Sequence, residues 1–398
     1  MSRLEHFAPT RDEALARIAA VRPGDYARSR NAIDGAVTGL SPYITHGIVE
    51  LPDVALRVAA SHPLELQHRF MLELGWREFF RHVWQQRGES IFASLRAGPL
   101  PDEAYARELP ADVREARTGV PAIDTAVRTL YATGYLHNHA RMWLASYLVH
   151  LRRVHWRVGA DWLYAHLLDG DLGSNHLSWQ WVAGTFSSKP YLFNADNVAR
   201  YAPAHWHSPG SAIDVSYEAL DAIARGASLP RIRPTGEGVE EPAIHLGVPA
   251  AADAPPPQGD AVAGRDVWLI HPWALREPPP DVPADVLRVS ICPVEFHDAW
   301  AWSASRWAFV GERMSTLSPL RWHGSIAQIG EALRGARSVR SVDDMHLGDG
   351  LHVLANCNPA PSLFGRVERS CGSFSQWWKQ VTRNAPPDTR AAKAMKAD

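Results

Sequence analysis

Cysteine is scarce in this sequence, which has three cysteines among 398 residues, at Cys292, Cys357 and Cys371. An odd, widely spaced set predicts neither a disulfide framework nor a zinc ribbon, and it is typical of a protein in the reducing cytoplasm. The usual iron–sulfur cluster needs four thiolates, so the count argues against that cofactor as well. We expect no metal centre built on cysteine.

Long hydrophobic runs are also missing. No stretch of about 18 apolar residues could span a bilayer, and the first residues lack the basic-then-apolar pattern of a signal peptide. A formal charge of −2 and a hydrophobic content of 46% are typical of a globular protein. We therefore expect a cytoplasmic protein of two or three domains that does not bind membranes.

Lysine is rare, so arginine carries almost all of the positive charge; the lysines are Lys189, Lys379, Lys393 and Lys396. Arginine suits bidentate contacts to phosphates and carboxylates, although genome composition explains the bias equally well. A near-neutral chain is not expected to coat nucleic acid, but a local arginine face could still bind a few phosphates. The glycine-rich signatures of dinucleotide-binding and phosphate-binding loops are absent.

Tryptophan, in contrast, is abundant, with 16 residues. Trp179 and Trp181 follow the polar, turn-prone stretch Asp-Gly-Asp-Leu-Gly-Ser-Asn-His-Leu-Ser over residues 169–178. Such rings more often pack in a core, but the flanking carboxylates indicate a planar aromatic ligand held beside oriented acids. A calcium loop is excluded because Gly173 stands at a ligand position and Ser174 at the sharp-turn glycine position.

The first half of the chain is predicted to be helical from Pro9 to about Ala202. Apolar residues recur at three- and four-residue spacing, most clearly over residues 65–86 and 123–158, and residues 97–119 indicate loops with a short helix. Proline, glycine and alanine are frequent over residues 227–264, where periodicity is lost. We expect a helical domain over 1–210 and a linker or extended segment over 211–263.

The second half has a different pattern, with short buried strands and amphipathic helices in alternation. Strands are expected over residues 267–270, 286–291 and 351–354, and helices over 303–317 and 325–333. This alternation is typical of an α/β layer with a parallel sheet. We therefore predict a small α/β domain over residues 264–398.

Four segments of the helical half could contribute to one site. The first contains Tyr26, Arg30 and Val-Thr-Gly-Leu-Ser-Pro-Tyr over residues 37–43, where hydroxyls and free backbone N–H groups suit a phosphate. The same residues also fit a simple helix N-cap at Ser41 with proline in the first turn. In the second segment, one helix face carries Glu73, Trp76, Arg77 and Phe80, which suits either a wet cavity or an ordinary surface ion pair beside a core tryptophan.

The third segment is Thr-Gly-Tyr-Leu-His-Asn-His-Ala-Arg-Met over residues 133–142, and the fourth begins at Asp169. His137 and His139 would point in different directions on a helix and have no evident third ligand, so we expect no metal there. Asn138, Arg141 and Met142 share one face. A buried Arg141 requires a carboxylate partner, and Asp169 is the natural one.

Taken together and in this order, Trp-Arg-Glu-Phe, His-Asn-x-x-Arg-Met and Asp-Gly-Asp…Asn…Trp-Gln-Trp resemble the FAD-binding domain of the DNA photolyase and cryptochrome family over about residues 20–200. The resemblance implies a folded-back FAD in an all-helical domain. The FAD contacts that it implies are Tyr26, Thr38, Gly39, Leu40, Ser41, Arg77, Asn138, Arg141, Asp169, Gly170, Asp171 and Asn175. The positions that match those receiving a flipped-out pyrimidine dimer are Glu73, Trp76, Asn138, Met142 and Trp181.

The resemblance also implies a chemistry, which is electron transfer from photoexcited reduced FAD to the dimer. The residues to which it gives catalytic roles are Glu73, Asn175, Trp179 and Trp156. Glu73 would hydrogen-bond the dimer, Asn175 would lie near the flavin nitrogen that is protonated on redox change, and Trp179 and Trp156 match the inner and middle electron carriers. No tryptophan stands at the outer position, near which Tyr105 lies. His137-Asn138 matches enzymes that act on cyclobutane dimers.

The sequence departs from the family in three places. Val37 replaces a hydroxyl residue, and Thr-Phe-Ser-Ser-Lys-Pro after Gly184 replaces the usual continuation of the DNA-contacting surface. The antenna domain is not found at the N-terminus; residues 267–336 resemble a piece of it moved toward the C-terminus, and the sequence does not define an antenna chromophore. Repair of damaged DNA in blue light is the leading hypothesis. The alternatives are a cryptochrome-like photoreceptor that signals to a partner protein and a flavin-binding subunit that needs a separate antenna chain.

Overall fold

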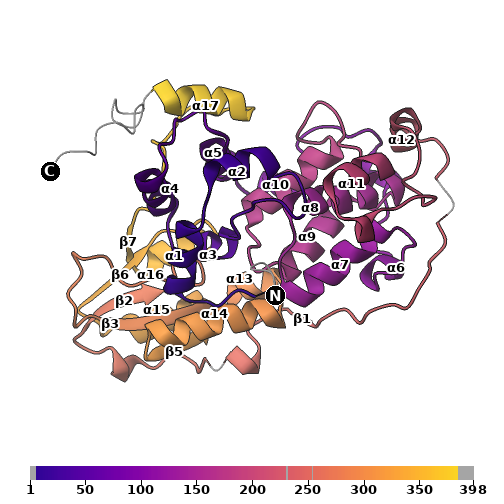
Figure 1. Cartoon of the computed structure of the whole chain (residues 1–398). Helices are drawn as coiled ribbons and strands as arrows, with labels where there is room; N and C mark the ends of the chain where they lie inside the picture. Colours follow the sequence, from indigo (N-terminus) through magenta and orange to yellow (C-terminus); the bar gives the residue numbers. More distant parts are fainter. Residues whose placement is uncertain (1–5, 230–231, 253, 384–398) are drawn as a thin grey trace.

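The computed structural model describes residues 6–229, 232–252 and 254–383, which form two parts (Figure 1). A helical part comes first, and a long segment leads from it to an α/β layer, residues 266–358. The predicted fold class, a helical domain with a C-terminal α/β region, is confirmed. None of the described helices is long and apolar enough to cross a membrane. Lys393 and Lys396 lie outside the described residues.

The helical part surrounds the candidate site with short helices joined by tight turns. Its helices are α1 (Arg11–Ala19), α2 (Pro23–Ser29), α3 (Ser41–Thr45), α4 (Leu51–Ser61), α5 (Arg69–Arg87), α6 (Ala111–Arg114), α7 (Pro121–Thr133), α8 (Asn138–Ser146), α9 (Trp156–His166), α10 (Leu172–Ala183), α11 (Ala195–Tyr201) and α12 (Tyr217–Ala224). The periodic stretch over residues 123–158 is divided among α7, α8 and α9. Helix α7 ends because Gly134 adopts a left-handed conformation with φ of 64°. A π-helical turn, Tyr147–Leu151, continues α8.

The segment between the two parts is held against the helices. Residues 211–263, predicted as a linker, contain α12 and strand β1 (Ile244–His245), which pairs antiparallel with β4 (Trp302–Ser303). Glu241 accepts a hydrogen bond from Trp162 Nε1 at 2.8 Å and lies 2.9 Å from His166 Nε2. These contacts attach the segment to α9. The division of the chain at residues 210 and 264 stays a prediction.

The α/β layer contains a five-stranded sheet in the order β5-β3-β2-β6-β7, and all its pairings are parallel. Its strands are β2 (Asp266–Ile270), β3 (Leu287–Pro293), β5 (Leu320–Gly324), β6 (Ser338–Val342) and β7 (Asn356–Asn358), and its helices are α13 (Val294–Ala299), α14 (Ala304–Leu317), α15 (Ile326–Leu333) and α16 (Gly348–Leu354). The predicted strand over residues 351–354 is wrong, since these residues end α16. Leu351 and Leu354 are both buried at a spacing of three, which is a helical period.

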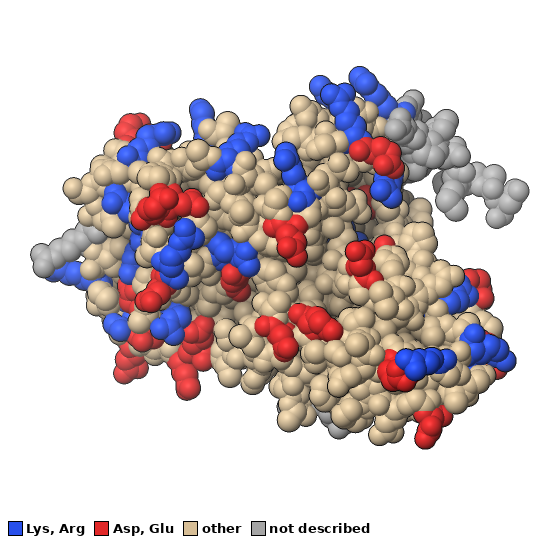
Figure 2. Space-filling model, turned by 180° about the vertical axis from the view of Figure 1, so that it is seen from behind, with Lys and Arg blue, Asp and Glu red and all other residues tan. Residues whose placement is uncertain are grey.

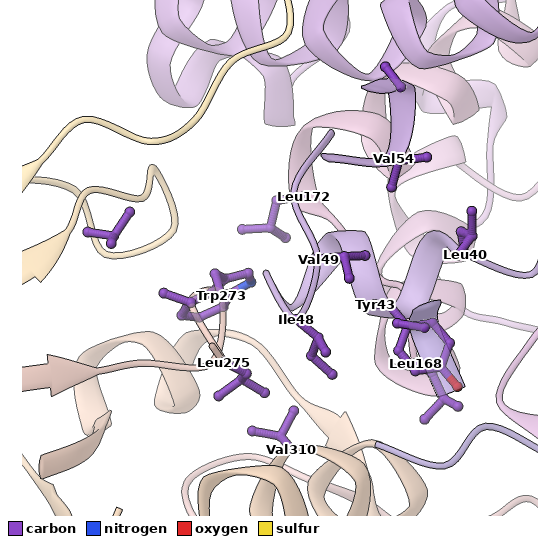
Figure 3. Packing of buried hydrophobic residues seen from close by; sticks show 14 of the residues in the cluster. Leu40, Tyr43, Ile48, Val49, Val54, Leu168, Leu172, Trp273, Leu275 and Val310 are labelled. Atoms are coloured by element: carbon purple, nitrogen blue, oxygen red, sulfur yellow. The ribbon is translucent and has the colours of Figure 1, made fainter. Parts of the chain in front are cut away.

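One hydrophobic core joins the two parts (Figure 3). Leu40, Tyr43 and Ile48 from the helical part lie in the same cluster as Trp273 and Val310 from the α/β layer. The fully buried His46 connects them further. Its Nδ1 lies 2.6 Å from the Pro272 carbonyl oxygen and its Nε2 lies 2.9 Å from the Leu168 carbonyl oxygen. These contacts hold the turn after helix α3 and the segment before Asp169 against the α/β layer.

Candidate functional site

An open cavity of about 210 Å³ lies between α5, α8, α9 and α10. Many of the sequence-predicted site residues line it: Glu73, Trp76, Arg77, Asn138, Arg141, Met142, Asp169, Asp171, Asn175 and Trp179. The structure thus brings three of the four predicted segments to one cavity.

Arg141 and Asp169 form the ion pair that the sequence predicts. The Arg141 Nη2 atom lies 2.9 and 2.8 Å from the two carboxylate oxygens, and its Nε donates to the Leu136 carbonyl oxygen at 2.7 Å. Burial by itself raises the pKa of Asp169, but the adjacent Arg141 guanidinium outweighs burial and holds that pKa below its usual value. Asp169 therefore stays charged at neutral pH.

Arg77 brings positive charge to the same wall. Its Nη1 donates to Thr45 Oγ1 at 3.0 Å, and Thr45 in turn donates to the Asp169 carbonyl oxygen at 3.3 Å. Burial lowers the pKa of Arg77. Among the residues that the structure describes, no carboxylate lies within ion-pair distance of this guanidinium. An anionic group of a ligand would compensate for that charge.

Asp171 begins helix α10 and connects the cavity to the α/β layer. Its carboxylate accepts the Ser174 N–H at 2.7 Å as an N-cap, and it lies 3.8 Å from His346 Nε2. His346 also bonds Asp344 at 2.6 Å through Nδ1 and stacks on Trp273, with ring centroids 4.4 Å apart. The sequence analysis did not include His346, because nothing local links it to residue 171.

One face of α10 presents polar groups to the cavity. Asn175 uses its Nδ2 to donate to the Ala160 carbonyl oxygen at 2.8 Å, so its carboxamide oxygen remains an acceptor for a ligand. Ser174 and Ser178 line the cavity on the same face, and the Ser174 hydroxyl is buried with no hydrogen-bond partner among the described residues. The sequence analysis missed both serines, although their spacing of three and seven from Asp171 follows the helical period.

Glu73 lies at the cavity and pairs with Arg30, a residue of the first predicted segment. Its carboxylate is 3.2 Å from Arg30 Nε, and about a third of its side chain is exposed. In the same wall, Asn138 Nδ2 lies 3.7 Å from Met142 Sδ. Glu73 can donate a hydrogen bond to a ligand only after it leaves Arg30 and takes up a proton.

Besides Trp76, four aromatic residues were considered as electron carriers or stacking groups, and they differ in how deeply they are buried. Trp179 is buried and lines the cavity, against Gly159, where an added Cβ would lie 2.3 Å from the indole ring. Trp156 is also buried, and its Nε1 donates to Ser94 Oγ at 3.0 Å. Trp181 does not belong to the cavity lining and is 38% exposed, with Tyr191 as its ring neighbour. Tyr105 is half-buried beside His155.

The remaining predicted cofactor residues do not line the cavity. Leu40 and Gly39 are buried before α3, and Gly39 needs its φ of 60°, which favours glycine. Thr38 Oγ1 accepts the Leu40 N–H, Ser41 begins α3, and Tyr26 packs edge-on against Phe70. The Gly170 carbonyl oxygen accepts a hydrogen bond from the buried Arg306 of α14 at 2.6 Å.

Comparison with known proteins gives one consistent result. Residues 70–205 match the family described as the FAD binding domain of DNA photolyase. The deoxyribodipyrimidine photo-lyase of Synechococcus sp. is 31% identical over 218 residues, covering 50% of this chain and 41% of that protein. A cryptochrome DASH of Idiomarina loihiensis is 30% identical over 210 residues, covering 50% and 47%. The chain therefore spans less than half the length of these relatives.

A solved structure gives a similar match. The crystal structure of a Synechocystis sp. cryptochrome aligns with a TM-score of 0.43 and 27% identity, over 48% of this chain and 43% of that one.

The residues of the cavity fit a flavin nucleotide. The Arg77 guanidinium suits a phosphate, and Asp169 and Asp171 suit hydroxyl or N–H donors. The unpartnered Ser174 hydroxyl and the free Asn175 carboxamide oxygen provide further polar contacts, while Trp76 and Trp179 provide ring surfaces. The cavity thus offers the charges and planes that FAD requires.

Proposed function

We propose that this chain, which belongs to the DNA photolyase and cryptochrome family through its FAD-binding domain, repairs cyclobutane pyrimidine dimers in DNA in blue light. The observation that supports repair is the joint position of two kinds of residue. Glu73, Trp76 and Met142, at the positions that receive the dimer, line the same cavity as Asp169 and Asn175, at the flavin positions. A dimer bound at the first set would therefore lie close to a flavin bound at the second.

The protein contributes binding, orientation and exclusion of water to this reaction. Bound FAD supplies light-driven transfer of one electron. A damaged base pair is less costly to unstack than an intact one, which favours entry of the dimer into the cavity. Trp76 offers a ring surface on which a base can stack. Asn138 and Met142 of α8 line the same cavity.

Glu73 acts in this proposal through a change of partner. Entry of the dimer would displace the Arg30 guanidinium, and a protonated Glu73 would then donate a hydrogen bond to a carbonyl of the dimer. Such a bond stabilises the charge that develops there during electron transfer. Arg30, at the end of α2, would be free to meet a DNA phosphate.

The test uses the purified chain with its flavin reduced beforehand. An oligonucleotide carrying one cyclobutane thymine dimer is incubated with the protein in blue light and in the dark, and restored thymines are counted by chromatography. We expect repair in the light only, and a Glu73→Gln variant should lower the yield per photon more than it lowers dimer binding. Equal dimer loss in both incubations, or no loss at all, would rule out repair.

A photoreceptor without repair activity is the second candidate. The position of Trp181 favours it, because this proposed dimer contact is exposed and does not line the cavity. For a photoreceptor, the same incubation would change the flavin spectrum on illumination and leave the dimer intact.

A further inference from the structure

The last described segment of the chain, residues 362–383, packs along helix α5. Glu78 of α5 accepts hydrogen bonds from the Ser362 hydroxyl and the Phe364 N–H, each at 3.1 Å. His82, one turn later, accepts the Cys371 N–H at 3.2 Å. These hydrogen bonds to buried acceptors fix the path of the segment. The segment leads into helix α17 (Phe374–Arg383), which lies over α5 (Figure 1).

Helix α17 approaches α5 closely because Gly75 has no side chain. A Cβ at this position would lie 2.6 Å from the Trp378 ring, so only glycine permits the contact. Trp377 and Trp378 are buried in the interface, whereas Lys379 on the opposite face of α17 is exposed. Figure 2, seen from behind, shows blue side chains at the upper edge next to the grey terminal residues. The aromatic face of α17 therefore packs against α5 and Phe364.

Phe374, the first residue of α17, stacks on Trp76. The ring centroids are 4.2 Å apart and the planes are inclined by only 11°. Helix α5 has one face toward α17, which carries Gly75 and Phe79, and another toward the cavity, which carries Glu73 and Arg77. Trp76 lies between these two faces. Phe374 thus supports Trp76 from the side of α17, and the indole also lines the cavity.

We propose that Phe374 is a positioning residue that holds the Trp76 indole in the orientation required to stack on a base in the cavity. The inference rests on the proposed function, since it takes the base of a dimer as the ligand of Trp76. Helix α17 lies outside residues 70–205, the part that matches the FAD-binding family. The support for Trp76 is therefore provided by this chain's own C-terminal segment.

The expected change in affinity for the dimer comes from the conformational freedom of one side chain, the Trp76 indole. Without Phe374, the indole would sample several rotamers, and a base would have to select one of them on binding. Immobilising one such side chain corresponds to about 3- to 10-fold in affinity. Binding of undamaged DNA should change little, because phosphate contacts dominate it.

The experiment compares three variants of the full chain. Phe374→Ala removes the stacking ring, Phe374→Tyr retains it, and Val381→Ala weakens the buried face of α17 two turns after Phe374. Affinities are measured for an oligonucleotide with one cyclobutane thymine dimer and for the undamaged oligonucleotide, and thermal stability and flavin content are measured on the same samples. We expect Phe374→Ala to lose about 3- to 10-fold of the preference for damaged DNA. Phe374→Tyr should keep the preference, and Val381→Ala should lower only stability.

A second measurement does not depend on DNA. In protein labelled with 5-fluorotryptophan, the Trp76 fluorine signal is assigned by its absence in Trp76→Phe, and we expect Phe374→Ala to shift it and Val381→Ala to leave it in place. An unchanged Trp76 signal in Phe374→Ala would overturn the positioning role, as would an unchanged preference for the dimer. If the parent protein shows no such preference, the proposed function fails, and the fluorine signal alone then decides whether Phe374 orients Trp76.

Discussion

Two ion pairs with a buried carboxylate lie in different parts of the helical half. The Arg141–Asp169 pair lies in the cavity wall, and the Arg152–Asp112 pair lies away from the cavity with N–O distances of 2.8 and 2.9 Å. Loss of the cation from such a pair leaves a buried carboxylate without compensation, at a cost of about 3–5 kcal/mol. A comparison of variants that lack each arginine therefore distinguishes a general loss of stability from a specific loss of the ligand.

Arg141→Ala should yield protein that retains little flavin, because the uncompensated Asp169 carboxylate would reorganise or repel nearby phosphates. Flavin absorbance per protein after gel filtration measures the effect. Arg152→Ala is the matched control, which should be less stable yet keep its flavin. Full flavin occupancy in Arg141→Ala would contradict the assignment of this pair to the cofactor site.

Trp179→Phe should slow photoreduction of the oxidised flavin, because in photoreduction the electron reaches the flavin through Trp179. Repair by protein that was reduced beforehand should remain, because in repair the electron passes from the flavin to the dimer. Absorbance is followed during illumination with an external reductant present. Trp206→Phe is the control, since Trp206 is buried but does not line the cavity. Photoreduction of Trp179→Phe at the parental rate would show that another aromatic residue delivers the electron.

At the scale of elements, the α/β layer reaches the cavity through the loop before α16. His346 lies between Asp344, which pairs with Arg81 of α5 at 2.6 Å, and Asp171 at the start of α10. Burial raises the pKa of Asp344 by itself, but Arg81 and His346 outweigh it and hold that pKa well below its usual range. Three elements thus meet at one charged cluster.

His346→Ala should lower the free energy of unfolding by about 1–3 kcal/mol, the cost of leaving buried polar partners unsatisfied. It should also weaken flavin retention, because Asp171 loses a neighbour that orients it. Denaturant titration and flavin titration of the same sample measure the two effects. His352→Ala, on the outer side of α16, is the control and should leave both unchanged. If His346→Ala retains flavin as the parent does, the α/β layer has no part in the cavity.

At the scale of the whole molecule, buried histidines should make stability depend on pH. Burial lowers the pKa of His46 and His297 to about 3 and that of His137 and His150 to about 4, all from 6.5. The unfolded chain therefore binds more protons than the folded one below pH 6.5. Stability is fully present above that pH and is lost as the pH falls toward the folded-state values.

We expect the free energy of unfolding to fall between pH 7 and pH 5, with each such histidine contributing up to about 1.4 kcal/mol per pH unit. His297→Phe should make this dependence shallower, since the ring at 297 packs against Trp302 and Trp307 and no proton would then be taken up there. Denaturant titrations at several pH values measure the slope. A parental stability that is constant over this range would contradict the prediction.

Much of the cavity could be predicted because its residues follow local periods. Glu73 and Arg77 are one helical turn apart, and the polar face of α10 repeats with the same period. The pairing of Arg141 with Asp169 followed from the cost of burying an arginine without a carboxylate. The predicted strand over residues 351–354 is wrong because this short stretch, with three apolar residues among four, fits a helix as well as a strand.

The sequence alone was enough to predict the helical and α/β halves, the resemblance to the FAD-binding domain of DNA photolyases and most of the side chains that line the cavity. Three contacts could be seen only in the folded chain: Arg30 pairs with Glu73, His346 lies near Asp171, and Phe374 stacks on Trp76. The physical reason is that each of these contacts joins residues far apart in the sequence. They form only when whole elements pack closely against one another, as α17 does where Gly75 leaves room for its rings, and no local period encodes that packing.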